Sequence, residues 1–188
     1  MGFSALNAQG LSAPPYFLSF LMCILTTWIA DRSQQRGLVI ITLCLVGGVG
    51  YVLLATCKAV AIRYFGIFLA AAGIFPAISN ILAWVLNNQG TDTKRGVGYS
   101  LLQTVGQCGP IVGTRLYPAT DGPLYTKGQW ICAAFMFLCA LLALFLRTYL
   151  KWQNKQAEKR EHDALGATEI HAKGVAVENE GHGFRNVL

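Results

Sequence analysis

Apolar residues dominate five long stretches of this chain, and short polar loops separate them. The stretches are residues 14–30, 37–57, 64–86, 97–114 and 130–146, and none contains Asp, Glu, Lys or Arg. A bilayer core about 30 Å thick is crossed by about 20 mostly apolar residues in a helix, which is close to the length of each stretch. A helix on a water-soluble core would show a polar face, and these stretches show almost none. The pattern therefore predicts an all-α, polytopic membrane helix bundle.

The composition agrees with this prediction. Hydrophobic residues make up 54% of the chain and charged residues 13%, whereas soluble domains carry about 25% charged residues. The net charge of +6 could suggest nucleic acid, but the basic residues lie at the ends of the apolar stretches and in the carboxyl-terminal tail. That placement is typical of membrane orientation, so we expect contact with membrane lipid and no nucleic-acid partner.

The reactive side chains predict no chemistry of their own. The six cysteines lie within or at the end of apolar stretches, and the three histidines lie in the polar tail. No Cys/His spacing typical of a metal site occurs, so we interpret the cysteines as small buried hydrophobes and expect no metal or cofactor. The apolar stretches also lack paired carboxylates, histidine clusters and nucleophile–base pairs, so we expect no enzyme. The first stretch contains Pro14-Pro15 and lacks a basic leader, and we expect it to remain as a span.

Basic residues predict the orientation. If the five stretches cross the membrane in turn, nine Lys and Arg residues lie near the spans on one side and four on the other. Loops rich in Lys and Arg remain in the cytoplasm. The amino terminus is therefore predicted outside and the carboxyl terminus inside, and the plasma membrane is the expected location.

The third and fourth stretches are interrupted near their middle. Pro76 lies in the third, and Gly109-Pro110 lies in the fourth. Proline removes a backbone hydrogen bond and kinks a helix. Asn80, Gln103 and Gln107 place polar side chains in the same two stretches. These features favour either a cavity-lining role or hydrogen bonding between helices, and the sequence leaves both open.

Several segments together resemble one transporter family. The loop Asp31-Arg32-Ser33-Gln34-Gln35-Arg36-Gly37 is similar to the D-R-x-x-x-R-G loop of the major facilitator superfamily. Other segments resemble the carboxyl-terminal half of its fungal anion:cation symporter branch, which includes allantoate- and nicotinate-permease-like proteins. These segments are residues 11–16, 84–88, 93–95, 106–113, 117–118 and 150–155.

The resemblance implies a partial major facilitator fold. The five spans would correspond to helices 8 to 12 of a twelve-helix carrier, so residues 1–150 would form part of its carboxyl-terminal six-helix half. Residues 151–188 would form a cytoplasmic tail, with a helix extended as far as Asp163 and disorder beyond Gly166. Counterparts of helices one to seven are absent, so the resemblance implies a fragment. Such a fragment would associate with a missing amino-terminal half or a full-length carrier, and we expect no transport by it alone.

The resemblance also suggests two groups of functional residues. The cavity candidates are Tyr16, Asn80, Trp84, Gln103 and Gln107, for which helix–helix hydrogen bonding or interfacial anchoring is the alternative. The gate-loop candidates are Asp31, Arg32, Arg36, Lys94 and Arg95, which would otherwise be solvated loop charges that set the orientation.

The predicted function is transport of a small organic anion, such as a carboxylate vitamin or ureide, by a secondary transporter of which this chain is a part. No acidic residue lies inside a span, so no proton-coupling group is evident here. The alternative is a non-transporting membrane scaffold, or a truncated regulator that binds full-length carriers.

Overall fold

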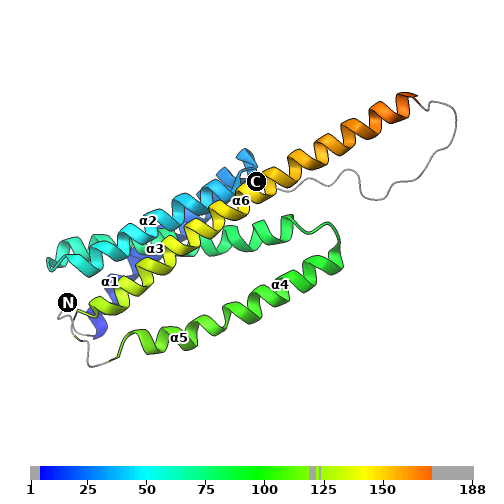
Figure 1. Cartoon of the computed structure of the whole chain (residues 1–188). Helices are drawn as coiled ribbons and strands as arrows, with labels where there is room; N and C mark the ends of the chain where they lie inside the picture. The colour runs from blue at the N-terminus through cyan, green and yellow to red at the C-terminus, as the bar shows by residue number, and fades with distance from the viewer. Residues whose placement is uncertain (1–4, 119–121, 123, 171–188) are drawn as a thin grey trace.

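The fold is a bundle of antiparallel helices with one loosely attached arm (Figure 1). The computed structural model describes residues 5–118, 122 and 124–170, with side chains described over 9–118, 122 and 124–160. The helices of the described part are α1 (Ala5–Ser33), α2 (Arg36–Thr56), α3 (Val60–Asn87), α4 (Asp92–Gly106), α5 (Cys108–Leu116) and α6 (Thr126–Ile170). This part of the chain contains no strand, so the all-α prediction is confirmed.

Four helices are long and apolar enough to cross a membrane. Their apolar spans are Gln9–Ser33, Arg36–Thr56, Val60–Asn87 and Thr126–Arg160. They correspond to the first, second, third and fifth predicted stretches. Successive helices run in opposite directions, so the α1–α2 loop, the α3–α4 loop and the far half of α6 lie at one end of the bundle (Figure 1).

The fourth predicted stretch differs from the prediction of one continuous helix. It folds as two shorter helices, α4 and α5, with a turn at Gln107 between them. Pro110 has no N–H to donate to the carbonyl of Gly106, so the ladder of hydrogen bonds is interrupted at this point. Neither piece alone has the length of a membrane span.

The first helix begins earlier than the stretch predicted from Pro14. Helix α1 starts at Ala5 and carries Pro14 and Pro15 inside it. Pro15 cannot donate to the carbonyl of Leu11. The hydroxyl of Tyr64, on α3, donates to that carbonyl at 3.1 Å and replaces the missing donor.

The tail is helical further than predicted. Helix α6 continues through Ile170, so the expectation of disorder beyond Gly166 is wrong for residues 167–170. Residues 158–163 combine acidic and basic side chains, which support a solvated helix through pairs three and four residues apart. The rest of the tail lies outside the described residues.

Helix α2 lies at the centre of the packed region. It packs against α3 on one side and α6 on the other, and α3 also packs against α1. Large buried side chains are few in this core. Its buried members are Ile40, Leu43, Cys44, Ala77, Trp84, Ala140, Ala143 and Leu150. The many alanines among them allow the helices to approach closely.

Glycines bring α2 and α3 into direct backbone contact. A Cβ atom added to Gly73 would lie 2.5 Å from the backbone nitrogen of Gly47, and one added to Gly50 would lie 2.5 Å from that of Ala70. No real side-chain atom fits at such distances. Only glycine therefore permits this separation of the two helices.

The residues of α4 and α5 form an arm (residues 92–116) that makes few contacts with the bundle. No residue of either helix is buried. A Cβ atom added to Gly106, Gly109 or Gly113 would meet nothing within 4 Å. In Figure 1 the arm runs apart from the other helices along most of its length.

Candidate functional site

The α1–α2 loop brings two of the predicted gate-loop residues together. The side chain of Arg36 pairs with the carboxylate of Asp31. Gln34 adopts a positive φ of 54°, and its amide donates to the backbone carbonyl of Asp31 at 2.7 Å. This turn directs the chain from the end of α1 into the start of α2. Arg32 is exposed and stays outside the pair.

Arg147, on α6, holds the same loop from the other side. Its guanidinium donates to the side-chain carbonyl of Gln35 at 3.0 Å. A Cβ atom added to Gly37 would lie 3.1 Å from Cδ of Arg147 and 3.2 Å from Cζ2 of Trp84. Gly37 therefore lets the arginine stem and the indole ring pack against the start of α2. Our sequence reasoning treated Arg147 only as an orientation charge, and nothing local in the sequence reveals its contact with a loop 112 residues away.

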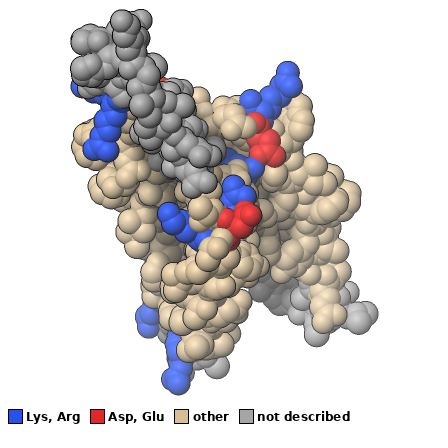
Figure 2. Space-filling view, turned by 90° about the vertical axis from the view of Figure 1, so that its right-hand side faces the viewer, with Lys and Arg blue, Asp and Glu red and all other residues tan. Residues whose placement is uncertain are grey.

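The other two gate-loop candidates, Lys94 and Arg95, lie in the first turn of α4, next to the α3–α4 loop. The guanidinium of Arg95 donates to the carboxylate of Asp92 at 3.3 Å and to the carbonyl of Gln89 at 3.1 Å. Lys94 is exposed. Figure 2, viewed toward this end of the bundle, shows acidic groups set beside basic ones on a surface that is otherwise mostly uncharged. The two hydrogen bonds of Arg95 join residues that lie close together in the sequence, around the start of α4.

Asn80 lies inside the bundle, between α1 and α3. It is completely buried, and its amide donates to the hydroxyl of Thr26 at 3.3 Å and to the carbonyl of Pro76 at 2.9 Å. Its carbonyl oxygen is also buried and has no hydrogen-bond partner. The hydroxyl of Thr26 donates to the carbonyl of Met22 at 2.7 Å. The side chain thus links α3 to α1, and Thr26 is a partner that the sequence analysis missed.

Trp84 and Tyr16 occupy different surroundings. Trp84 is 3% exposed and belongs to the core shared by α2, α3 and α6. Tyr16 is 58% exposed, and its ring lies 5.5 Å from that of Phe75. The rings of Tyr16 and Phe75 line an open, mainly apolar groove of about 440 Å³ between α1, α2, α3 and the start of α6.

Gln103 and Gln107 belong to the separate arm. On α4, Ser100, Gln103 and Thr104 follow the spacing of one helical face, and Gln107 continues it at the break. Val105 lies across the helix from Gln103 and Gln107, whereas Val97 and Leu101 flank Thr104; the three are 70%, 56% and 62% exposed, respectively.

We call the first set the polar stripe (Ser100, Gln103, Thr104 and Gln107). The two hydroxyls donate to backbone carbonyls one turn earlier, at 2.9 and 2.8 Å, and the Gln103 amide donates to the hydroxyl of Tyr99 at 3.2 Å. The arm is therefore amphipathic, although it comes from one of the apolar stretches.

The cavity candidates do not converge on one enclosed pocket. Asn80 and Trp84 are buried within the bundle, Tyr16 lines the open groove, and the two glutamines lie on the arm. Their roles in binding stay predictions. No group of three or more His, Cys, Asp or Glu residues in the described part of the chain is placed to hold a metal ion.

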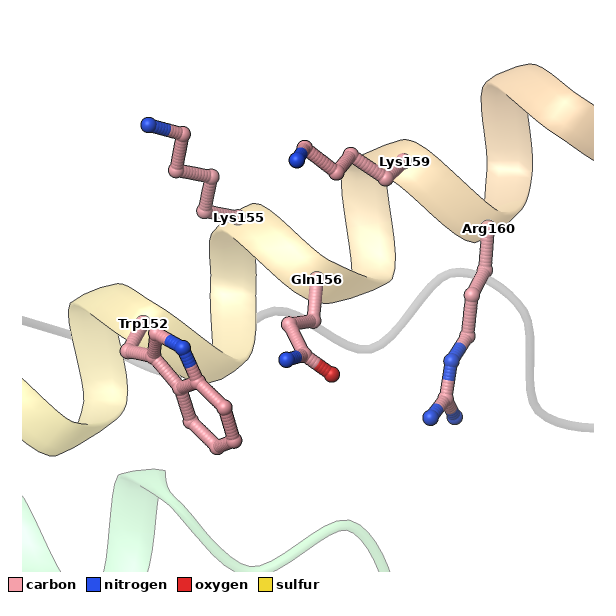
Figure 3. Close-up of a pocket in the computed structure, with 5 residues that line it drawn as sticks. All are labelled: Trp152, Lys155, Gln156, Lys159 and Arg160. Carbon is pink, nitrogen blue, oxygen red and sulfur yellow. The ribbon is translucent and has the colours of Figure 1, made fainter.

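A shallow pocket on the far half of α6 is of a different kind. It is lined by Trp152, Lys155, Gln156, Lys159 and Arg160, all from this one helix (Figure 3). Figure 3 shows the two lysines on one side of the helix and the other three side chains on the opposite side. Side chains from a single helix do not enclose a ligand, and long basic side chains on such a helix are ordinarily solvated.

The relatives of the chain are transporters. It is 31% identical over 160 residues to the MFS transporter prlL of Fungal sp. (strain NRRL 50135), covering 83% of this chain and 32% of the relative. It is 27% identical over 178 residues to the MFS-type transporter cnsO of Penicillium expansum, covering 92% of this chain and 34% of the relative. It is 28% identical over 135 residues to the high-affinity nicotinic acid transporter of Saccharomyces cerevisiae, covering 72% of this chain and 25% of the relative.

These findings relate the chain to transporters of the major facilitator superfamily. It spans about a third of the length of the first curated relatives that it matches. No family model matches the chain, and no solved structure matches it either. With four long apolar helices and relatives that are transporters, the chain is an integral, multi-pass membrane protein, and its all-α bundle is similar to part of a major facilitator transporter.

Proposed function

We propose that this chain forms part of a secondary transporter that moves a small organic anion across the membrane. The observation that carries this proposal is its similarity, over most of its length, to major facilitator transporters, one of which is named for nicotinic acid. The substrate class is a small carboxylate, or a ureide of similar size, and the branch is that of the anion:cation symporters.

We infer that the chain would meet its substrate along the arm. The polar stripe carries two amide side chains, Gln103 and Gln107, across the helix from the exposed Val105. Polar side chains in a span face protein or water rather than lipid. The stripe would therefore line the water-filled path, and the apolar face would contact lipid or a further helix. Carboxamides donate and accept hydrogen bonds and suit a small polar anion.

The gate-loop residues would act at the cytoplasmic end. Asp31, Arg36 and Arg147 order the loop between α1 and α2 through an ion pair and a hydrogen bond. Lys94 and Arg95 lie in the first turn of α4, at the same end of the bundle. The proposed orientation places this end in the cytoplasm, because most of the basic residues near the spans gather there.

Uptake by a chimera tests the proposal. The homologous segment of the Saccharomyces cerevisiae nicotinic acid transporter is replaced by residues 1–160 of this chain, and the chimera is produced in a strain that takes up no nicotinate. We expect saturable uptake of radiolabelled nicotinate by the chimera and none by this chain alone. A chimera that reaches the membrane in folded form and takes up nothing would contradict the proposal. So would robust uptake by the chain alone, because the chain would then not be a part of a carrier.

Thiol labelling of intact cells tests the orientation. A single cysteine at Lys58, in the α2–α3 loop, should react with a membrane-impermeant thiol reagent. A single cysteine at Lys94, next to the α3–α4 loop, should react only after the cells are opened. Both positions are exposed, so the reverse pattern would overturn the orientation.

A further inference from the structure

Two cysteines face each other across the seam between α2 and α6. Cys44, on α2, lies in the central core, and Cys139, on α6, packs against that core beside it. Cys44 is completely buried and Cys139 is partly exposed. Both belong to, or pack against, the central core.

The register of the two helices supports this contact independently. Helices α2 and α6 run antiparallel (Figure 1). A Cβ atom added to Gly47 would lie 2.7 Å from the terminal methyl of Met136, and one added to Gly37 would lie 3.1 Å from Cδ of Arg147. Cys44 lies three residues before Gly47, and Cys139 lies three residues after Met136. In two antiparallel helices, the Gly47–Met136 contact therefore places Cys44 opposite Cys139, and the Gly37–Arg147 contact gives the same alignment.

We propose that Cys44 and Cys139 form an oxidative modification site, at which a peroxide converts the two thiols into a disulfide that ties α2 to α6. In the first step Cys139 gives up its thiol proton and the thiolate attacks one oxygen of the peroxide; the O–O bond breaks, Cys139 becomes a sulfenic acid, and the departing hydroxide takes up the proton and leaves as water. In the second step the thiol of Cys44 attacks that sulfur, the S–O bond breaks, and a second water leaves. The two thiols lose two electrons in total, and the peroxide gains them.

The surroundings favour this product over a thiolate–metal complex. The site lies in an apolar core, where a charged thiolate is costly, whereas a disulfide carries no charge. Hydrogen peroxide is small and neutral, and it reaches the partly exposed Cys139 first. A disulfide requires Cα atoms about 4.4–6.8 Å apart, and Gly47 and Gly48 allow the two helices to approach closely next to the pair.

The other cysteines provide matched controls. Cys23 lies 3.9 Å from the hydroxyl of Ser79, and Cys132 lies 3.3 Å from that of Tyr117. Each of these two thiols therefore has a hydroxyl as its neighbour. Cys108 lies on the arm and is exposed, so it reacts with a peroxide without a neighbouring thiol to complete a disulfide.

The test uses the full chain in membranes, treated with hydrogen peroxide at low protein density. Free thiols are then blocked, the protein is denatured without reductant, and trypsin releases residues 37–58 and 128–147 as separate peptides. We expect a cross-linked pair of these two peptides in which fragmentation assigns the bond to Cys44 and Cys139. Cys44→Ala and Cys139→Ala should abolish the cross-link, whereas Cys57→Ala and Cys132→Ala should retain it.

Two results would overturn the proposal. One is the absence of the cross-link although Cys108 is oxidised in the same sample. The other is a cross-link that persists in Cys44→Ala, which would assign it to Cys57. If Cys44→Ala or Cys139→Ala fails to accumulate, the serine variant at the same position replaces it. The amount of protein recovered is measured for every variant. The proposal does not depend on the transport function, because the readout is the bond itself.

Discussion

Glycines occur both between α2 and α3 and along the arm, and their surroundings in the two regions are opposite. Between α2 and α3 a glycine is required, because any side chain at Gly50 or Gly73 would overlap backbone of the facing helix. On the arm, Gly106, Gly109 and Gly113 face open space. The helices α2 and α3 thus find their packing partners within this chain, whereas the arm does not. The comparison also shows that small residues alone do not tell which helix faces are in contact.

The two regions differ in their polar residues as well. In the packed region Asn80 and Thr26 bond to each other and to nearby carbonyls, and neither is exposed. On the arm the polar stripe bonds within its own helix, and Gln107 is exposed. The first arrangement stabilises a bundle, whereas the second leaves polar groups available for water, substrate or another helix. The proposed function rests on this second region.

The largest expected effect is that of Gly73→Ala. The new methyl group would overlap the backbone of Gly47, which has no rotamer to change, so we expect a loss of stability of about 1–3 kcal/mol or more. The measurement is the temperature at which the detergent-solubilised protein loses its monodisperse peak. Gly113→Ala is the matched control and should be neutral or slightly stabilising, because alanine favours a helix by about 0.5–1 kcal/mol. Equal melting of the two variants would break the comparison.

Arg147→Met should have a smaller, local effect. Methionine preserves part of the apolar stem over Gly37 but removes the hydrogen bond to Gln35, which is worth about 1 kcal/mol. We expect faster deuterium exchange in residues 31–37 and little change in α3. The control is Lys151→Met, one turn further along α6. If exchange of the loop is the same in both variants, then Arg147 does not hold the loop.

The Asn80–Thr26 pair should contribute less. Asn80→Leu, Thr26→Val and the double variant form a thermodynamic cycle, and we expect a coupling energy of about 0.6 kcal/mol, typical of such bonds between membrane helices. In the chimera, Asn80→Leu should lower stability and leave the KM for nicotinate unchanged, because the side chain is completely buried. A rise in KM without a loss of stability would instead assign Asn80 to the substrate path.

Gln107→Leu should have the smallest effect on stability, because the residue is exposed at the break between α4 and α5. If its amide contacts the substrate, the KM of the chimera should rise about tenfold, which corresponds to about 1.4 kcal/mol. Val105→Gln, on the opposite face of the arm, is the control and should leave the KM unchanged. A fall in stability with a constant KM would show that Gln107 bridges helices.

The sequence predicted the helical fold because runs of apolar residues report the length of a span directly. It also predicted an interruption of the fourth stretch near Pro110, whereas α3 continues through Pro76 as one helix. It did not predict which glycines lie at an interface, since Gly73 and Gly113 differ only in what faces them. The contact of Arg147 with Gln35 was missed for the same reason: it joins positions 112 residues apart, and only the folded register brings them together.

The candidate site was predictable in part. The pairing of Asp31 with a loop arginine is seen, because both residues flank one short turn. The grouping of Asn80 with Gln103 and Gln107 is not seen, because Asn80 faces α1 while the glutamines lie on the arm. Polarity within a span indicates that a side chain avoids lipid, but it does not indicate whether that side chain contacts another helix or water.

Thiol accessibility along the arm tests the central claim most directly. Single cysteines are placed at positions 97, 100, 101, 103, 104, 105 and 107 of the chimera, in a background without native cysteines, and treated with a small charged thiol reagent. The account predicts labelling at 100, 103, 104 and 107, reduced by excess nicotinate, weaker labelling at the flanking positions 97 and 101, and none at 105. Uniform labelling, or labelling of the apolar face alone, would contradict the assignment of the polar stripe to the water-filled path.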